Sequence, residues 1–157
     1  MPFTLYHWGF ALLFGRRFEP DDRLRATIIG IVAVSFPDLE GFANVMLGME
    51  QIPIHGVLHS FLGAFLSGLA IALLSKAIWK ELSMEEFVLY TFLPLFGHVA
   101  IDLLMYPDMK PFLPFSGINN PIIIPFGQGL AFSLCIVALV VWAIWVIWDW
   151  LDEPGLV

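Results

Sequence analysis

Long apolar runs separated by short polar connections make up most of this chain. Asp, Glu, Lys and Arg are absent from residues 51–75, 87–101 and 111–148. A helix of about 20 apolar residues crosses the hydrocarbon core of a bilayer. We therefore expect each of these runs to supply a membrane-spanning helix.

Turn and breaker residues divide the chain into predicted elements. The segment 3–14 is too short to span a membrane alone, 41–51 indicates a loop or short interfacial piece, and Pro94 predicts a kink. The expected elements are helices at 3–14, 26–36, 53–80, 87–106 and 127–148, with a loop at 106–125. This pattern predicts an all-α, polytopic integral membrane helical bundle of about four to five membrane helices including a short N-terminal one, in a single domain over 1–157.

Composition supports a membrane protein and excludes several other classes. Hydrophobic residues make up 59% of the chain and charged residues 13%, whereas a soluble domain has about 25% charged residues. No basic patch with interleaved aromatic residues is present, so nucleic acid is not an expected partner. The single cysteine, Cys135, excludes an internal disulfide. The N-terminus lacks the basic region of a removable signal peptide.

The basic residues predict an orientation in the membrane. Four arginines lie in the connection 16–25, and Lys76 and Lys80 lie in another. Because such residues mark the cytoplasmic side, the turns at 38–53 and 106–121 are expected to face outward. Lys110 is an exception to this pattern.

All four histidines lie in or beside apolar segments, where an ionisable group is costly and indicates function. A spacing of four predicts that His55 and His59 share one helix face, and that His98 and Asp102 share another. Together with His7 and Asp38, they are all expected in the outer half of the bundle. Helical bundles build metal sites in this way. Imidazole with carboxylate favours zinc ahead of manganese or iron.

Simpler interpretations of these residues stay open. A single membrane histidine is more often a packed, hydrogen-bonded residue than a ligand, although the whole set favours a metal site. Asp38 is also suited to cap the following turn. Asp108 has the alternative role of a solvated loop acid, and the role of Glu40 is similarly open.

Five short motifs, taken in order, carry a resemblance to a known family. They are Pro2-Phe3-Thr4 followed by His7, Pro37-Asp38-Leu39-Glu40, His55-Gly56-Val57-Leu58-His59-Ser60, Gly97-His98 followed by Asp102, and Asp108-Met109-Lys110-Pro111-Phe112. The chain resembles the small membrane-bound metal-dependent hydrolases of bacteria and archaea, a family distantly similar to zinc-dependent phospholipase C. It departs from that pattern at Gly56, where relatives often have a basic residue, and at Glu40, where they have aspartate.

The resemblance implies specific roles for these residues. One metal ion would be held by Asp38, His59, His98 and Asp102. A second would be held by His7 and the other oxygen of Asp102, with His55 or Asp108 completing it. The candidate catalytic residues are Glu40, His55 and Asp108, with Glu40 or His55 as the general base. The implied cofactor is one or two zinc ions.

The implied activity is that of a phosphoesterase in the cell membrane of a bacterium or archaeon. Its site would face the outside, and its partners would be membrane lipids and a lipid or phosphorylated small-molecule substrate. A homo-oligomer through the glycine-rich face of segment 53–80 is a further expectation. Two rival classes stay open: a proton- or metal-ion-conducting transporter subunit, and a non-catalytic packing protein.

Overall fold

The computed structural model describes residues 4–15, 20–122 and 124–152. Its elements are α1 (Thr4–Gly15), α2 (Pro20–Ser35), η1 (Phe36–Asp38), α3 (Leu39–Leu47), η2 (Val57–His59), α4 (Phe61–Ile78), α5 (Met84–Pro94), the π-helical turn η3 (Leu95–Val99), α6 (Ala100–Asp102) and α7 (Gly127–Asp152). Within these ranges there is no β-strand, so the predicted all-α class is confirmed. Pro2, Phe3, Arg16 and Arg17, used above, lie outside the described residues.

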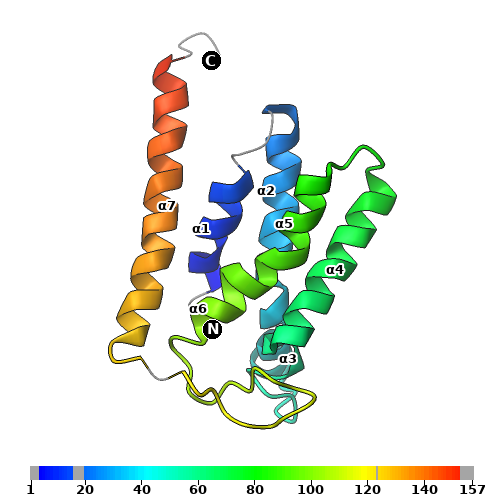
Figure 1. The fold of residues 1–157 in the computed structure, drawn as a ribbon, viewed down its shortest axis with the longest axis vertical. Coiled ribbons are helices and arrows are strands. Elements are labelled where there is room, and N and C mark those ends of the chain that lie inside the picture. Colours follow the sequence, from blue (N-terminus) through cyan, green and yellow to red (C-terminus); the bar gives the residue numbers. More distant parts are fainter. Residues whose placement is uncertain (1–3, 16–19, 123, 153–157) are drawn as a thin grey trace.

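Four helical stretches in the described part are long and apolar enough to cross a membrane. They are 23–47, which contains most of α2 together with η1 and α3, then 61–78, 84–102 and 127–151. Helix α1 is shorter and packs between α2 and α7. Figure 1 shows α2, α5 and α4 side by side, with α7 standing beyond α1. The predicted polytopic bundle with a short N-terminal helix is therefore confirmed.

Helices α4 and α5 pack closely because small residues line their contact. A side chain at Gly68 would overlap the backbone oxygen of Thr91, so only glycine fits there. Ala64, Ser67 and Ala72 are buried on the same helix. The predicted small-residue face of this helix exists, but α5 covers it within the chain. It therefore gives no support to a homo-oligomer, which stays a prediction.

The helix predicted from Pro53 begins later than expected. Helix α4 starts at Phe61, because the Ser60 hydroxyl caps it by accepting a hydrogen bond of 3.0 Å from the Gly63 amide. The preceding turn folds back so closely that a side chain at Gly63 would overlap the Val57 carbonyl. The prediction that His55 and His59 share one α-helical face is therefore wrong. His59 instead ends the short helix η2.

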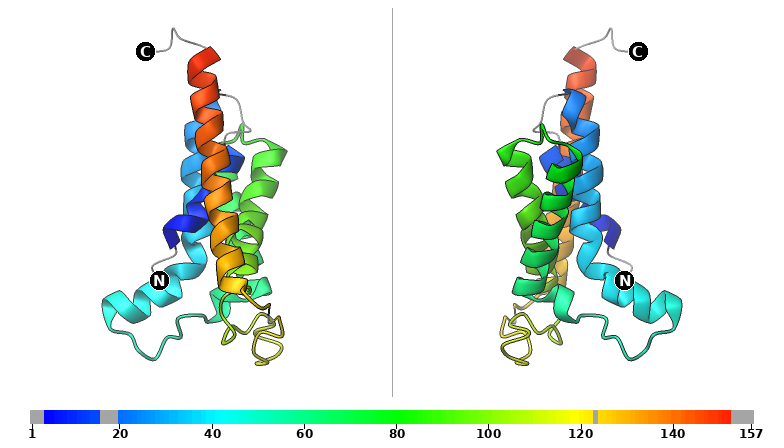
Figure 2. Two further views of the ribbon diagram at one scale, coloured as in Figure 1. Left: turned by 90° about the vertical axis from the view of Figure 1, so that its left-hand side faces the viewer. Right: turned by 90° about the vertical axis from the view of Figure 1, so that its right-hand side faces the viewer.

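Segment 41–51 is also more ordered than a loop. Helix α3 occupies most of it and ends at Gly48, whose φ of 65° is the left-handed conformation that glycine accepts readily. Figure 2 shows α3 projecting sideways from the bundle. Its exposed apolar residues are Leu39, Phe42, Val45, Met46 and Leu47.

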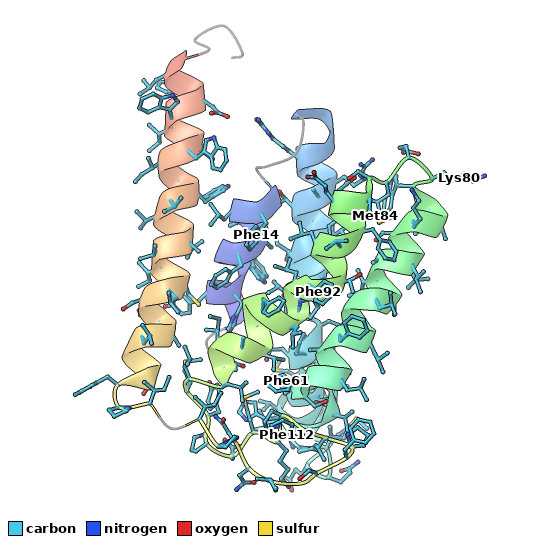
Figure 3. The ribbon with its side chains drawn as sticks, viewed as in Figure 1. Phe14, Phe61, Lys80, Met84, Phe92 and Phe112 are labelled. Carbon is cyan, nitrogen blue, oxygen red and sulfur yellow. The ribbon has the colours of Figure 1, made fainter. Side chains whose placement is uncertain are left out.

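The predicted interruption at Pro94 is present, because regular α-helix ends there and continues as the π-helical turn η3. After α6 the chain forms the predicted irregular loop. Asn120 holds this loop by donating hydrogen bonds to the carbonyls of Leu103 (2.6 Å) and Tyr106 (3.1 Å). The rings of Phe61 and Phe112, 5.7 Å apart, pack the loop against the start of α4 (Figure 3).

A buried acid lies at the opposite end of the bundle, near the turn between α4 and α5. Glu86 is 1% exposed and accepts hydrogen bonds from the Arg25 guanidinium (2.9 Å), the Tyr90 hydroxyl (3.1 Å) and the Ser83 amide (3.0 Å). We call these four residues the Glu86 cluster. Because each oxygen of Glu86 has partners, the cluster is a completed structural contact between α2 and α5.

Candidate metal centre

Five ionisable side chains meet at the end of the bundle that carries α3 and α6. They are His7 from α1, Asp38 from η1, His59 from η2, His98 from η3 and Asp102 from α6. The three histidines and Asp102 are buried, and the Asp38 side chain is 16% exposed. We call these five residues the His/Asp cluster. The structure thus brings together residues from five separate elements, as the sequence predicts.

Asp102 lies between the histidines. Its Oδ1 is 3.2 Å from Nε2 of His7, whereas its Oδ2 is 3.2 Å from Nε2 of His98 and 3.9 Å from Nε2 of His59. The predicted pairing of His98 with Asp102 across one helical turn is therefore confirmed. The two oxygens face different histidines, which is the arrangement that a bridging carboxylate needs. That Asp102 bridges two ions stays a prediction.

Asp38 points into the cluster rather than capping a helix. Its Oδ1 is 3.5 Å from Nε2 of His98 and 3.6 Å from Nε2 of His59. Asp38 does occupy the N-terminal cap position of α3, but its side chain makes no capping hydrogen bond there. The alternative interpretation as a cap is therefore wrong.

The donor atoms are close enough together to hold a metal ion. Three sets have ligand atoms within 4.8 Å of one another: His7 with His98 and Asp102, Asp38 with His59 and His98, and His55 with His59 and Asp102. Because the sets share His59, His98 and Asp102, they form one continuous centre. Imidazole nitrogens and carboxylate oxygens are the donors that zinc and similar divalent ions accept.

Several of these buried atoms have no hydrogen-bond partner. They are both ring nitrogens of His59, both ring nitrogens of His98 and Oδ1 of Asp102. The Nε2 atoms approach the Asp102 carboxylate at 3.2 to 3.9 Å without the geometry of a hydrogen bond. Leaving a buried polar group unsatisfied costs about 1–3 kcal/mol each. A cation among these atoms would satisfy several of them at once, so the residues present fit a metal ion.

The backbone of η3 prepares His7 as a ligand. Nδ1 of His7 lies 2.9 Å from the carbonyl oxygen of Gly97, to which only a protonated nitrogen can donate. In the neutral ring the lone pair is then on Nε2, which faces Asp102. Such a hydrogen bond from the far nitrogen commonly orients metal-binding histidines. The π-helical turn that supplies the carbonyl is a feature found frequently at functional sites.

Glu40 borders the cluster from α3. Its Oε2 accepts a hydrogen bond of 3.0 Å from the Leu58 amide and lies 3.7 Å from Nδ1 of His59. A side chain at Gly56 would meet the Glu40 carboxylate at 2.7 Å. The two positions at which the chain departs from the pattern of the hydrolases that it resembles are therefore neighbours in the structure. Glycine at 56 leaves the space that the longer side chain at 40 occupies.

His55 and Asp108 form a pair at the edge of the cluster. Nδ1 of His55 is 3.2 Å from Oδ2 of Asp108, whose side chain is 69% exposed. The His55 ring also lies against the rings of Tyr106 (4.3 Å between centroids) and His59 (5.0 Å). His55 therefore reaches the cluster by its position in a turn rather than on α4. Its catalytic role, and the role of Asp108 in catalysis or as a ligand, stay predictions.

Carboxylates surround both His59 and Tyr106. Burial lowers the pKa of His59, but the carboxylates of Asp38 and Glu40 outweigh burial and raise that pKa above its ordinary value. Burial, together with the nearby carboxylates, raises the pKa of Tyr106 to about 12, so its hydroxyl stays neutral. The raised pKa of His59 indicates an environment that favours a cation.

Two contributors to the site could not be predicted from the sequence. The Gly97 carbonyl orients His7, and the Leu58 amide holds Glu40. Both act through backbone atoms, so residue type gives little sign of them. Tyr106, the ring neighbour of His55, is expected from the sequence only as the end of a helix.

A protein-family model matches nearly the whole chain. The model, described as YdjM inner membrane protein, covers residues 3–153. No curated protein and no solved structure matches the chain significantly.

Proposed function

The chain belongs to the YdjM inner membrane protein family, and it is a multi-pass protein of the inner membrane. We propose that it is a metal-dependent hydrolase of that membrane, acting as a phosphoesterase on a lipid or lipid-linked phosphate. The metal would be zinc, as one or two ions held by the His/Asp cluster. The site would face the outer leaflet.

One observation carries this proposal: a cluster of three histidines and two aspartates in which five buried polar atoms lack hydrogen-bond partners. A packing role would require those atoms to be satisfied by one another, as they are in the Glu86 cluster. Charged and polar donors without partners are instead expected where a ligand completes the site.

The residues around the cluster suit hydrolysis of a phosphate ester. A bound zinc ion would supply stabilisation of the charge on a phosphoryl group and a lowered pKa for attacking water. The imidazoles of the cluster, with its two aspartates, would hold that ion. Glu40 is the proposed proton acceptor, because its carboxylate is fixed by the Leu58 amide at the edge of the cluster. His55, held by Asp108, is the alternative acceptor.

The location of the cluster supports a lipid substrate. The cluster lies at one end of the spans, at the level of α3, whose exposed apolar side chains suit the boundary between headgroups and acyl chains (Figure 2). A phosphate attached to a lipid resides at that depth. The outward orientation rests on the arginine and lysine pattern.

Transport has less support. An ion path would need polar groups from one end of the bundle to the other. In the described part of the chain, a buried core that includes Ile29, Ala33, Ile71 and Ala72 lies around the middle of α2 and α4. The cluster is therefore better suited to chemistry at one face.

Metal analysis combined with an activity assay tests the proposal. We expect the purified protein in detergent to contain about one or two zinc ions per chain. We also expect it to release phosphate or a phosphorylated headgroup from lipid substrates. His59→Ala should lower both the zinc content and the activity, whereas the matched control Glu86→Gln, a buried site outside the cluster, should retain both. Absence of bound metal in a folded wild-type protein would contradict the proposal.

A further inference from the structure

A cavity lies beside the His/Asp cluster, between the chain that follows Asp102 and the start of α7. Its volume is about 230 Å³. Leu103, Leu104 and Met105 line one side, and Ile122 and Ile124 of the loop line another. The first turn of α7 borders it at Gly127, where a side chain would overlap the Leu104 carbonyl. Tyr106 and Gln128 add polar groups to a lining whose other side chains are apolar, and the start of α7 packs directly against the chain at Leu104.

Two residues of the cavity lining also lie next to proposed metal ligands. Tyr106 lines the cavity and also lies against the ring of His55, 4.3 Å away between centroids. Met105 lines the cavity and also a smaller gap of about 10 Å³ that His7 borders from α1. The cavity thus shares Tyr106 with the surroundings of His55 and Met105 with those of His7.

We propose that this cavity seats one hydrocarbon chain of the substrate while the attached phosphate lies at the His/Asp cluster. The inference rests on the proposed function and deepens it, since it makes the substrate class a phosphate ester on a long alkyl or prenyl chain. Membrane spans adjoin the cavity, so such chains are present at high concentration. The volume of the cavity is below the roughly 300–1,000 Å³ that is typical of small-molecule sites. It therefore suits part of one hydrocarbon chain rather than a whole lipid.

Cavity-filling variants with two substrates test the assignment in the full-length protein in detergent. The substrates are dodecyl phosphate and butyl phosphate, which share a headgroup and differ in chain length. Ile124→Trp and Ile122→Trp should lower kcat/KM for dodecyl phosphate by about tenfold or more, the effect of about two methylene groups that are no longer buried. Butyl phosphate hydrolysis should change less than about twofold. The matched control is Ile118→Trp, an exposed residue of the same loop that does not line the cavity, and it should affect neither substrate.

A photoreactive dodecylphosphonate with a diazirine on its chain separates failure of this inference from failure of the proposed function. Phosphonate cannot be hydrolysed, so the label reports binding alone. Labelling at Met105, Ile122 or Ile124, lost in Ile124→Trp, supports the chain site even where neither phosphate ester is hydrolysed. The inference would be overturned by an absence of labelling at these residues or by labelling spread along the lipid-facing side of α7. It would also be overturned if the variants lowered kcat/KM equally for both substrates. Correct folding of each variant is checked by gel filtration.

Discussion

Two buried sets of ionisable residues occupy opposite ends of this bundle, and they differ in how their polar atoms are satisfied. In the Glu86 cluster, the carboxylate receives hydrogen bonds from a guanidinium, a hydroxyl and a backbone amide. In the His/Asp cluster, both nitrogens of His59 and of His98 lack a partner. Burial alone therefore does not distinguish a structural set from a functional one.

The difference lies in what each set can do without a ligand. A buried charge is tolerated when its partners are complete, and the Glu86 cluster is complete within the protein. In the His/Asp cluster, imidazole nitrogens lie 3.2 to 3.9 Å from the Asp102 carboxylate, and five of the buried polar atoms have no hydrogen-bond partner. Its ligand atoms instead form overlapping sets of three that lie within 4.8 Å of one another. This contrast teaches that unsatisfied atoms, rather than charge or depth, mark the candidate site.

The largest expected effect on activity comes from replacing Asp102, whose carboxylate lies between the three histidines. Asp102→Asn keeps the size of the side chain but replaces one metal-binding oxygen, and Asp102 lies near all three histidines of the cluster. Loss of about 4 kcal/mol of stabilisation in the transition state corresponds to about a thousandfold fall in phosphoesterase kcat/KM. Zinc content, measured by mass spectrometry, should fall with it. A variant that keeps full activity would remove Asp102 from the mechanism.

The next largest effect should appear at the other end, in stability and not in metal content. Arg25→Leu leaves Glu86 buried without its cation, which should lower the free energy of unfolding by about 3 kcal/mol. Denaturation of the purified protein in detergent measures this change in the free energy of unfolding. Arg23→Leu is the matched control, because its pair with Asp149 at 3.5 Å is about one-third exposed and should contribute less than about 1 kcal/mol.

A double replacement sharpens the same comparison. Arg25→Leu with Glu86→Leu removes both charges and should recover much of the lost stability, since apolar residues often replace a buried ion pair without cost. Zinc content should stay at the wild-type level in every variant of this cluster. A loss of zinc here would show that the two ends of the bundle are coupled, and the contrast between a structural and a functional set would then fail.

Much of the fold could be predicted because the membrane imposes a simple pattern. Charge-free runs predicted α4, the α5–α6 stretch and α7. Proline residues predicted the helix interruptions at Pro37 and Pro94. The residues of the cluster could also be predicted, because ionisable side chains in such runs are few. Their approximate depth followed from the order of the turns.

The local backbone around His59 could not be predicted in the same way. Pro53 suggested a helix start, but the Ser60 cap and the close contact at Gly63 place that start at Phe61. The Ser60 signal is visible in the sequence, whereas the close approach of the preceding turn at Gly63 depends on tertiary packing. His55 and His59 still meet, with ring centroids 5.0 Å apart, through a turn rather than a shared helix face.

A smaller effect is expected from the contact between Gly56 and Glu40. Gly56→Ala places a methyl group 2.7 Å from the Glu40 carboxylate, which must then move away from the Leu58 amide. Loss of one hydrogen bond to a charged group, about 1.5 kcal/mol, corresponds to about a tenfold fall in kcat/KM with zinc content retained. Gly117→Ala is the control, because a side chain there meets nothing within 4 Å.

A double-mutant cycle separates this contact from a local backbone effect. With Glu40→Ala in place, Gly56→Ala should cause little further loss, because the carboxylate that it displaces is gone. Additive losses from the two substitutions would mean that Gly56 acts independently of Glu40. In that case the contact between Gly56 and Glu40 would not be part of what distinguishes the His/Asp cluster from the Glu86 cluster, and only the unsatisfied polar atoms would distinguish them.

The smallest effect should come from Asp108, and it tests where the His/Asp cluster ends. The Asp108 carboxylate is 69% exposed and pairs with His55 at 3.2 Å. An exposed ion pair contributes about 0.2–1 kcal/mol, so Asp108→Asn should lower kcat/KM by less than about fivefold and leave zinc content unchanged. A metal ligand would behave differently, with a loss closer to that of Asp102→Asn. A large loss of zinc would therefore extend the cluster to the exposed loop, and a small change would confine it to the five residues of the His/Asp cluster.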